Sequence, residues 1–177
     1  MQKTNFAFEI LLRDDASTDG TADICYKYAN KYPDKIRLFL HNRSNNIKIN
    51  GQATGRYCFI WNVKHAKGKY IALCEGDDYW TDPLKLQKQV DFLEINKEFN
   101  LCFTNLSIVN ENSEILELKR EYGSKSVFTH SDMPIYAHNS TRVFRNGYFP
   151  INKKLFFGFD TYLLIWLSKF GKIKYLD

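Results

Sequence analysis

The chain has 177 residues, 44% of them hydrophobic and 25% charged, which indicates a soluble globular protein with a single core. No apolar stretch reaches the roughly 20 residues of a membrane-spanning helix, and the N-terminus MQKTNFAFEI lacks the apolar segment of a secretory signal, so we expect a cytoplasmic protein. The net charge of +5 is spread along the chain and does not choose among a nucleotide, an anionic lipid and a nucleic acid.

A short apolar run opens the pattern of secondary structure. Residues 8–12 (FEILL) predict a buried strand that ends in the polar stretch RDDAST. Ser17 or Thr18 is then expected to cap a helix that Pro33 ends. The inner face of this helix is expected to carry Ile24, Cys25, Tyr28 and Tyr32, which recur at helical spacing.

Two further strands complete the first half of the chain. Residues 36–40 (IRLFL) predict the second strand, and the polar stretch HNRSNNIKINGQ predicts a loop. Residues 53–67 predict a helix that stops at Gly68, and residues 70–74 (YIALC) predict the third strand. Alternating strands and helices are typical of a largely parallel sheet covered on both faces, so we expect one α/β domain over residues 1–177.

The second half adds two helices and more strands. After EGDDYW, Asp82 predicts an N-cap and Pro83 the first position of a helix. The segments LCFTNLSIV and EILEL predict two strands joined by the turn NENSE. STRVF predicts a strand, FDTYLLIWLSKFG predicts a helix closed by Gly171, and IKYL predicts a last strand.

Acidic residues follow two of the predicted strands at the point where each ends. Asp14 and Asp15 come after FEILL, whereas Glu75, Asp77 and Asp78 come after YIALC. Because ligands bind at the carboxyl ends of strands in open parallel sheets, we expect the two clusters to share one rim. The alternative is that each cluster only forms a turn, since Asp favours turns and helix starts.

The residue types in these clusters indicate the ligand. Carboxylates without His or Cys are typical ligands of a hard cation such as Mn²⁺ or Mg²⁺. Such a cation keeps several waters, completes its shell with phosphate oxygens and stabilises a departing phosphate as a Lewis acid. The sequence therefore predicts a metal site that accepts a diphosphate.

Three segments, FEILLRDDASTDGTADI, AKGKYIALCEGDDYWTDPLKLQKQ and GFDTYLLIWL, resemble the family 2 glycosyltransferases. The resemblance covers most of the chain and implies the GT-A fold, a mostly parallel Rossmann-like sheet flanked by helices on both faces. It also implies transfer of a sugar from a nucleotide-sugar donor to a glycan or lipid-linked acceptor in bacterial surface-polysaccharide synthesis, with Mn²⁺ or Mg²⁺ and without a nucleic-acid partner. Peripheral contact with the inner face of the cell membrane fits such an acceptor.

Carried over to matching positions, the resemblance gives each acidic residue a role. Asp15 is the expected partner of the nucleotide base, with Asp14 beside it, and simple turn chemistry explains Asp14 equally well. Asp78 is the expected metal ligand. Asp77 is the second candidate for the metal, and the ribose or the donor sugar is its alternative partner. Glu75 is expected to be solvated or to lie behind the ligands.

Asp160, at the predicted helix start F-G-F-D-T, matches the general base of inverting family members. This base takes a proton from the acceptor hydroxyl as that hydroxyl attacks the anomeric carbon. The alternative is a carboxylate that only stabilises the helix dipole. The family often has Glu before this Asp, and this chain has Phe159 instead.

Three further residues have two interpretations each. Many members carry an Arg-Asn pair that contacts the donor, and the corresponding positions here are Phe59 and Ile60. Arg56, one helical turn earlier, is either a substitute for that Arg or a solvent-facing side chain. Trp80 lies next to the metal motif and either lines the sugar pocket or belongs to the core. His138 is expected to be structural or near the acceptor side.

The chain also differs from the family at its ends. Only seven residues precede FEILL, where the family has an additional strand and helix that form part of the nucleotide pocket. The chain stops soon after IKYL, where many members continue. We therefore interpret the chain as incomplete at the N-terminus and also at the C-terminus. We expect a partner chain, such as a second copy in a homo-oligomer, to complete the sheet, or catalysis to be impaired.

Two other classes of function compete with the transferase. A receiver-type signalling domain also carries acidic residues at strand ends, but it needs a lone phosphorylatable Asp after the third strand, which EGDDYWTDP fits poorly. A non-catalytic remnant would keep the fold and lose donor binding. Metal-dependent nucleotide binding separates the transferase from both.

Overall fold

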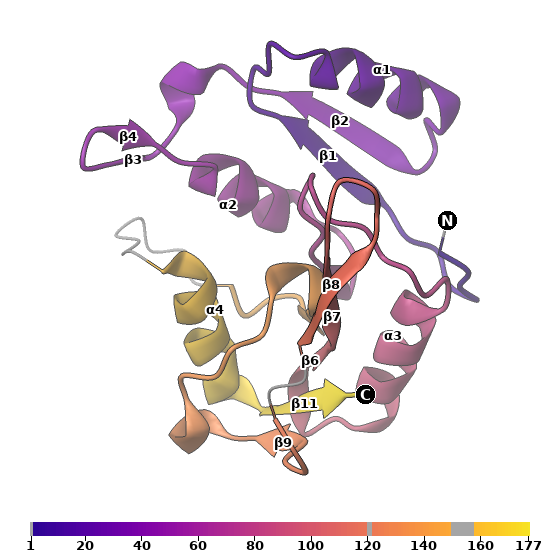
Figure 1. Cartoon of the computed structure of the whole chain (residues 1–177), viewed down its shortest axis with the longest axis vertical. Coiled ribbons are helices and arrows are strands. Elements are labelled where there is room, and N and C mark those ends of the chain that lie inside the picture. Colours follow the sequence, from indigo (N-terminus) through magenta and orange to yellow (C-terminus); the bar gives the residue numbers. More distant parts are fainter. Residues whose placement is uncertain (1, 120–121, 150–157) are drawn as a thin grey trace. The chain divides into compact units, whose positions relative to one another are not determined.

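The computed structural model describes residues 2–119, 122–149 and 158–177, and the chain forms two compact units. The N-terminal unit is Phe6–Gly68, and the C-terminal unit is Lys69–Asp177 together with Met1–Asn5 (Figure 1). The single domain predicted from the sequence stays a prediction.

The N-terminal unit contains the first two predicted strands. Strands β1 (Ile10–Asp14) and β2 (Ile36–Leu40) pair in parallel along their whole length. Helix α1 (Thr21–Lys31) connects them, as a crossover must where neighbouring strands are parallel. The two predicted strands and the helix between them are confirmed, with β1 displaced two residues toward the C-terminus.

Helix α1 begins later than predicted. Its N-cap is Gly20, whose φ of 87° is in the left-handed region, rather than Ser17 or Thr18. Of the predicted inner face, only Cys25 is buried, whereas Ile24 is 58% exposed and Tyr28 is 48% exposed. The predicted inner face is therefore confirmed at Cys25 and wrong at Ile24 and Tyr28, which are open to solvent.

Helix α2 (Arg56–His65) lies against β1 in the same unit. Asn62 on α2 donates a side-chain hydrogen bond to the backbone oxygen of Leu11 at 3.1 Å. The Arg13 guanidinium lies 4.2 Å from the ring centroid of Trp61. The predicted loop before α2 contains a 3₁₀ turn, η1 (Arg43–Asn45), and the short hairpin of β3 (Lys48–Ile49) and β4 (Gln52–Ala53).

The C-terminal unit is built on a five-stranded sheet. Its strands, in spatial order, are β5 (Tyr70–Ala72), β10 (Val143–Arg145), β6 (Phe99–Thr104), β11 (Lys172–Leu176) and β9 (Val127–Phe128). Strand β10 is antiparallel to both neighbours, β11 is parallel to β6, and β9 is antiparallel to β11.

The predicted α/β class is confirmed, and the larger sheet is mixed rather than mostly parallel. Parallel neighbours need a long crossover, usually a helix, whereas an antiparallel strand can be entered from a loop at the same edge. The described residues between β6 and β10 form strands and 3₁₀ turns without an α-helix, so β10 enters from such a loop.

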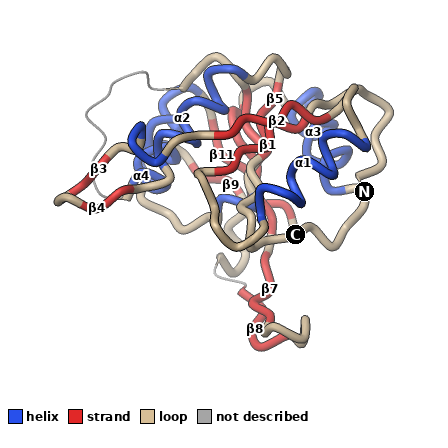
Figure 2. Tube along the Cα trace, turned by 90° about the horizontal axis from the view of Figure 1, so that it is seen from above, coloured by secondary structure: helices blue, strands red, loops and turns tan. Residues whose placement is uncertain are grey.

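Two helices flank this sheet. Helices α3 (Lys85–Ile95) and α4 (Phe159–Leu167) lie on opposite sides of β6 and β11 in Figures 1 and 2. The side chains of Leu93 on α3, Leu163 on α4 and Leu101 on β6 are fully buried and form the centre of the core. A 3₁₀ turn, η4 (Ser168–Phe170), leads from α4 into β11.

The predicted strand pair after α3 is confirmed, with a break at Asn105. Strands β7 (Leu106–Val109) and β8 (Ile115–Lys119) form an antiparallel hairpin that projects from the body of its unit in Figure 2. Two further 3₁₀ turns, η2 (His130–Asp132) and η3 (Asn139–Thr141), precede β10. Within the described ranges, every helix is too short or too polar to cross a bilayer.

Candidate functional site

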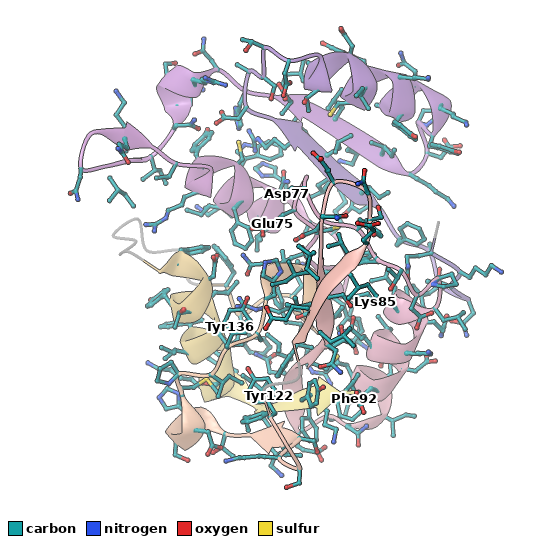
Figure 3. The ribbon with its side chains drawn as sticks, in the orientation of Figure 1. Glu75, Asp77, Lys85, Phe92, Tyr122 and Tyr136 are labelled. Carbon is teal, nitrogen blue, oxygen red and sulfur yellow. The ribbon has the colours of Figure 1, made fainter. Side chains whose placement is uncertain are left out.

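The loop after β5 and the segment before β10 meet because the two strands are adjacent and antiparallel. Ala72 at the end of β5 pairs with Val143 at the start of β10. Residues that follow Ala72 therefore face residues that precede Val143. Glu75 and Asp77 occupy this loop in Figure 3, and η3 supplies the opposite side.

Ser140 in η3 connects three parts of the loop after β5. Its buried hydroxyl accepts the backbone N–H of Glu75 at 3.1 Å and donates to Oδ2 of Asp78. Its carbonyl oxygen accepts the indole N–H of Trp80 at 2.7 Å. These bonds fix the backbone and two side chains of the EGDDYW loop on one short 3₁₀ turn.

His138 lies between two carboxylates of this loop. Its Nδ1 is 3.7 Å from Oδ2 of Asp78, and its Nε2 is 3.9 Å from Oε2 of Glu75. One ligand atom from each of the three residues lies within 4.8 Å of the others, a spacing compatible with one metal ion. The amide of Asn139 donates to Oε1 of Glu75 at 3.1 Å.

The other residues predicted around the metal lie outside this group. Asp77 is exposed and is not among the grouped ligands. Trp80 is half-buried with its indole N–H on Ser140, whereas Tyr79 is 55% exposed. The assignments of Asp77 to the metal and of Trp80 to the sugar pocket stay predictions.

Lys85, labelled in Figure 3, is at the start of α3 and contacts the ring of Trp80. Its ammonium is 4.6 Å from the centroid of the Trp80 ring and donates to Oε1 of Gln89 at 2.5 Å. The side chain is buried, and burial lowers the pKa of Lys85 to about 8. A buried amine with a lowered pKa thus contacts the last residue of the EGDDYW loop.

Asp160 is in the first turn of α4, as predicted, and is exposed. Its backbone oxygen accepts a hydrogen bond from Nη1 of Arg142 at 2.9 Å. Arg142 also donates from Nε to the backbone oxygen of Ala137 at 2.8 Å. Burial lowers the pKa of Arg142 to about 10, an effect that the neighbouring Asp160 opposes. The role of Asp160 as a base stays a prediction.

Asp14 and Asp15 belong to the N-terminal unit. Asp14 is buried, and its Oδ2 accepts the backbone N–H of Ser17 at 3.0 Å, which is turn chemistry. Asp15 accepts the amide of Asn46 at 2.5 Å. Within the described ranges, the second carboxylate oxygen of each Asp is buried without a hydrogen-bond partner. Their contact with a nucleotide, and the shared rim, stay predictions.

Arg56 opens α2, in the same unit as Asp15. Arg56 is half-buried, so it is not the fully solvent-facing residue of the alternative interpretation. A donor contact by Arg56 stays a prediction.

The sequence interpretation missed Asn139 and Ser140 and gave His138 no role in a metal site. It placed the strand start at Ser140, whereas β10 begins at Val143, so η3 was merged into a strand. The available signal was the polar run HNS directly before an apolar stretch. The antiparallel pairing of β5 and β10, which brings this run to the acidic loop, has no signature in the sequence.

A hollow adjoins His138 on the other side. Its walls include the aromatic side chains of Phe103, Tyr122, Tyr136 and Tyr175. Phe103 and Tyr175 are buried, whereas Tyr136 is 52% exposed at the rim. Aromatic faces with a polar tip suit the apolar faces of sugar rings.

The family model for glycosyl transferase family 2 matches residues 1–173. The chain belongs to this family. The match spans both units, and the α/β fold expected from the resemblance is confirmed.

Several known proteins are similar in sequence to part of this family 2 chain. An uncharacterized protein of Mycobacterium tuberculosis is 44% identical over 110 residues, which cover 62% of this chain and 30% of that protein. The UDP-Glc:alpha-D-GlcNAc-diphosphoundecaprenol beta-1,3-glucosyltransferase WfaP of Escherichia coli is 38% identical over 99 residues, or 56% of this chain and 35% of WfaP.

An uncharacterized glycosyltransferase of Methanocaldococcus jannaschii is 32% identical over 113 residues, which cover 64% of this chain and 35% of that protein. The aligned part of the chain thus spans about a third of the length of each of these relatives.

Proposed function

We propose that this protein transfers a sugar from a nucleoside-diphosphate sugar to a hydroxyl acceptor with inversion at the anomeric carbon. The observation that carries the proposal is the grouping of Asp78, Glu75 and His138 at the end of β5 in a family 2 chain. A polar cluster at the carboxyl end of a strand is where α/β folds bind their ligands.

The reaction forms one bond and breaks another at the same carbon. The acceptor oxygen bonds to the anomeric carbon while the bond from that carbon to the diphosphate oxygen breaks, and the nucleoside diphosphate leaves with the bonding electrons. Asp160 takes the proton of the acceptor hydroxyl. Its position in the exposed first turn of α4 gives the carboxylate access to a bound acceptor.

The residues at the end of β5 fit a divalent cation. Two carboxylates and an imidazole with ligand atoms within 4.8 Å form a donor set that Mn²⁺ or Mg²⁺ accepts. When bound, such an ion supplies Lewis-acid stabilisation of the departing diphosphate. Ser140 and Asn139 hold the two carboxylates in place by hydrogen bonds.

The remaining predicted residues take the donor in this proposal. Asp15 contacts the nucleotide base, with Asp14 behind it, and Arg56 contacts the diphosphate. Asp77 faces the ribose or the sugar, since its exposed side chain is outside the metal group. Trp80 borders the sugar from its position on Ser140.

The acceptor lies against the exposed Tyr136, near His138, in this proposal. Tyr136, which is 52% exposed at the rim of the aromatic hollow, offers a ring face to a sugar unit. WfaP, which is named for a diphosphoundecaprenol-linked acceptor, supports a lipid-linked glycan in bacterial surface-polysaccharide synthesis. Such an acceptor would bring the protein to the cytoplasmic face of the membrane.

The test is calorimetric titration of the chain with UDP, GDP and dTDP, with and without Mn²⁺, followed by transfer assays with the sugar nucleotides of the base that binds. We expect one nucleotide to bind only with Mn²⁺, and Asp78→Asn to abolish this binding. Asp91→Asn is the matched control, because Asp91 is exposed on α3 and its carboxylate accepts a hydrogen bond from the Gln87 amide.

The outcome separates the transferase from its competitors. If none of the three nucleotides binds in a metal-dependent way, the protein is better explained as a non-catalytic remnant of the fold. Nucleotide binding without sugar transfer would contradict the catalytic part of the proposal, namely the acceptor site or the role of Asp160 as general base. Equal nucleotide binding by Asp78→Asn and the wild type would contradict the proposed site.

A further inference from the structure

We propose that His138 binds the metal ion together with Asp78 and Glu75, and that this nitrogen ligand makes the site prefer Mn²⁺ to Mg²⁺. The inference rests on the proposed function, because it concerns the ion that the transferase would use. It replaces the ligand pair expected from the sequence, Asp78 with Asp77, by a set from two separate segments of the chain.

The distances around the imidazole support this set. His138 is 3.7 Å from the Asp78 carboxylate through Nδ1 and 3.9 Å from the Glu75 carboxylate through Nε2. Two ligands about 2.1 Å from one ion are about 3 Å apart when adjacent. One ligand atom from each residue lies within 4.8 Å of the others, so a closure of up to about 2 Å brings the three residues to bonding geometry. The proposed site uses three protein ligand atoms: one imidazole nitrogen of His138 and one oxygen from each carboxylate.

The residues that follow His138 orient both carboxylates. Asn139 donates to Oε1 of Glu75, which leaves Oε2 on the side of His138. Ser140 donates to Oδ2 of Asp78 and accepts the backbone N–H of Glu75. Partners of this kind fix the orientation of metal ligands and tune the affinity of a site. One tripeptide, HNS, thus supplies a ligand and the supports of the other two.

Asn139 provides a second, independent observation. Its side chain is only 6% exposed, and Oδ1 has no hydrogen-bond partner within residues 2–119, 122–149 and 158–177. The same amide donates to Oε1 of Glu75 through Nδ2 at 3.1 Å, so the residue with the unpartnered oxygen directly contacts the ligand group. Buried polar atoms without partners are rare and indicate an ion or water that belongs there.

A protonated His138 paired with both carboxylates would give the same distances without a metal. The two arrangements exclude each other, because a protonated imidazole has no lone pair for a metal. Metal binding therefore requires a neutral imidazole. A direct probe of the bond between the metal and nitrogen distinguishes them.

The nitrogen ligand sets the order of ion affinity. Mg²⁺ takes oxygen ligands, keeps several waters and gains little from an imidazole. First-row transition ions accept imidazole, and their affinities rise from Mn²⁺ through Co²⁺ toward Zn²⁺. We therefore expect Mn²⁺ to displace Mg²⁺ from the wild type, and this preference to depend on His138.

The first experiment needs no substitution. Pulsed electron paramagnetic resonance of Mn²⁺ bound to the full chain with UDP is expected to show modulation from a directly bonded ¹⁴N nucleus. Growth with ¹⁵N-labelled histidine should replace this modulation with the ¹⁵N pattern. Bound Mn²⁺ without nitrogen modulation would overturn the proposal.

The second experiment measures affinity. Free Mn²⁺ is counted by its electron paramagnetic resonance signal during titration, and Mg²⁺ is added as competitor. His138→Gln is expected to weaken Mn²⁺ binding roughly tenfold or more and to change Mg²⁺ binding little. His130→Gln is the matched control, because His130 is exposed, contacts Ser168 and is not among the three grouped residues. Circular dichroism verifies that both variants are folded.

The outcomes separate this inference from the proposed function. If His138→Gln keeps the Mn²⁺ affinity and selectivity of the wild type while Asp78→Asn loses them, His138 is not a ligand and the transferase proposal stands. If the wild type binds no Mn²⁺ with UDP, GDP or dTDP, both are overturned. Loss of Mn²⁺ preference in His138→Gln alone supports the nitrogen ligand.

Discussion

Arg142 donates a hydrogen bond from Nη1 to the backbone oxygen of Asp160 at 2.9 Å, and its Nε donates to the backbone oxygen of Ala137 at 2.8 Å. Ala137 directly precedes His138. One buried guanidinium therefore joins the segment that carries the proposed metal ligand to the helix turn that carries the proposed base. This connection sets how far apart the two groups are held.

The substitution Arg142→Met is expected to lower the free energy of unfolding by about 2 to 4 kcal/mol. The buried carbonyl oxygen of Ala137 and the partly buried carbonyl oxygen of Asp160 lose their donors, at about 1 to 3 kcal/mol each, and removal of a desolvated charge offsets part of this loss. Urea denaturation measures the change. Arg142→Lys keeps the charge, but a lysine cannot bond both carbonyl oxygens. Its free energy of unfolding should therefore lie between those of the wild type and of Arg142→Met. A Met variant as stable as the wild type would contradict this account.

Lys85→Met is expected to change how stability depends on pH. Burial lowers the pKa of Lys85 from 10.5 to about 8 in the folded protein. Between these values the unfolded chain binds a proton that the folded chain does not, so the stability of the wild type rises with pH relative to the variant. The rise amounts to about 3 kcal/mol from pH 8 to 10.5.

Denaturant titrations of wild type and variant at several pH values measure this difference. The slope is the relevant quantity, because Gln89 also loses its donor in the variant and this cost is independent of pH. Lys88→Met on the exposed side of α3 is the control and should retain the slope of the wild type. A constant difference between wild type and Lys85→Met would show that the amine is charged in the folded protein throughout this range.

Ser140→Ala is expected to weaken Mn²⁺ binding about 10- to 100-fold with the fold retained, because its hydroxyl holds both Asp78 and the backbone of Glu75. Titration of Mn²⁺ in the presence of UDP measures the effect. Ser131→Ala removes an exposed hydroxyl of η2 that contacts Thr129 and should bind Mn²⁺ as the wild type does. Unchanged affinity in Ser140→Ala would mean that the hydroxyl does not orient the ligands.

Asp160→Asn is expected to lower kcat by about 10² to 10⁴ while the affinity for the donor nucleotide stays the same, because only proton removal from the acceptor is lost. The hydrogen bond from Arg142 is made to the backbone and survives the change. Steady-state kinetics with calorimetry of nucleotide binding separates the two effects. Equal loss of donor affinity would instead assign Asp160 to binding.

Gly171→Ala is expected to destabilise the C-terminal unit by about 1 to 3 kcal/mol through overpacking. A Cβ at Gly171 would be 2.9 Å from the backbone oxygen of Glu98 and 3.0 Å from the backbone nitrogen of Asn100. Thermal denaturation measures the effect. Gly76→Ala is the matched control, since a Cβ there has no atom of the described residues within 4 Å. Equal melting temperatures would show that β6 and β11 separate easily at this point.

Local patterns in the sequence predicted most of the elements. Apolar runs such as IRLFL gave β2 at its observed bounds, because a short run of buried side chains between polar stretches has few other solutions.

Helix starts were less accurate. Asp82 caps a turn through Leu84 N–H, and α3 begins only at Lys85. Capping residues can serve a preceding turn as well as a helix.

The candidate site was predicted in part. Asp78 was identified because acidic residues after a buried strand have a local signature. His138 was not, because its approach to Asp78 depends on the antiparallel pairing of β10 with β5, in which Ala72 and Val143 are partners across 70 intervening residues. Long-range pairing of this kind follows from the whole sheet and not from any short segment.

The N-terminal unit has a thin core: among its described residues, only Cys25 and Val63 are buried apolar side chains. A unit with so few buried contacts opens locally at low free energy, and its amides should exchange with solvent sooner than those around Leu93 and Leu101. If Asp15 holds the nucleotide base as proposed, donor binding must also order this unit. Binding would then oppose local opening of the unit, and a saturating nucleotide should slow exchange selectively in β1 and β2.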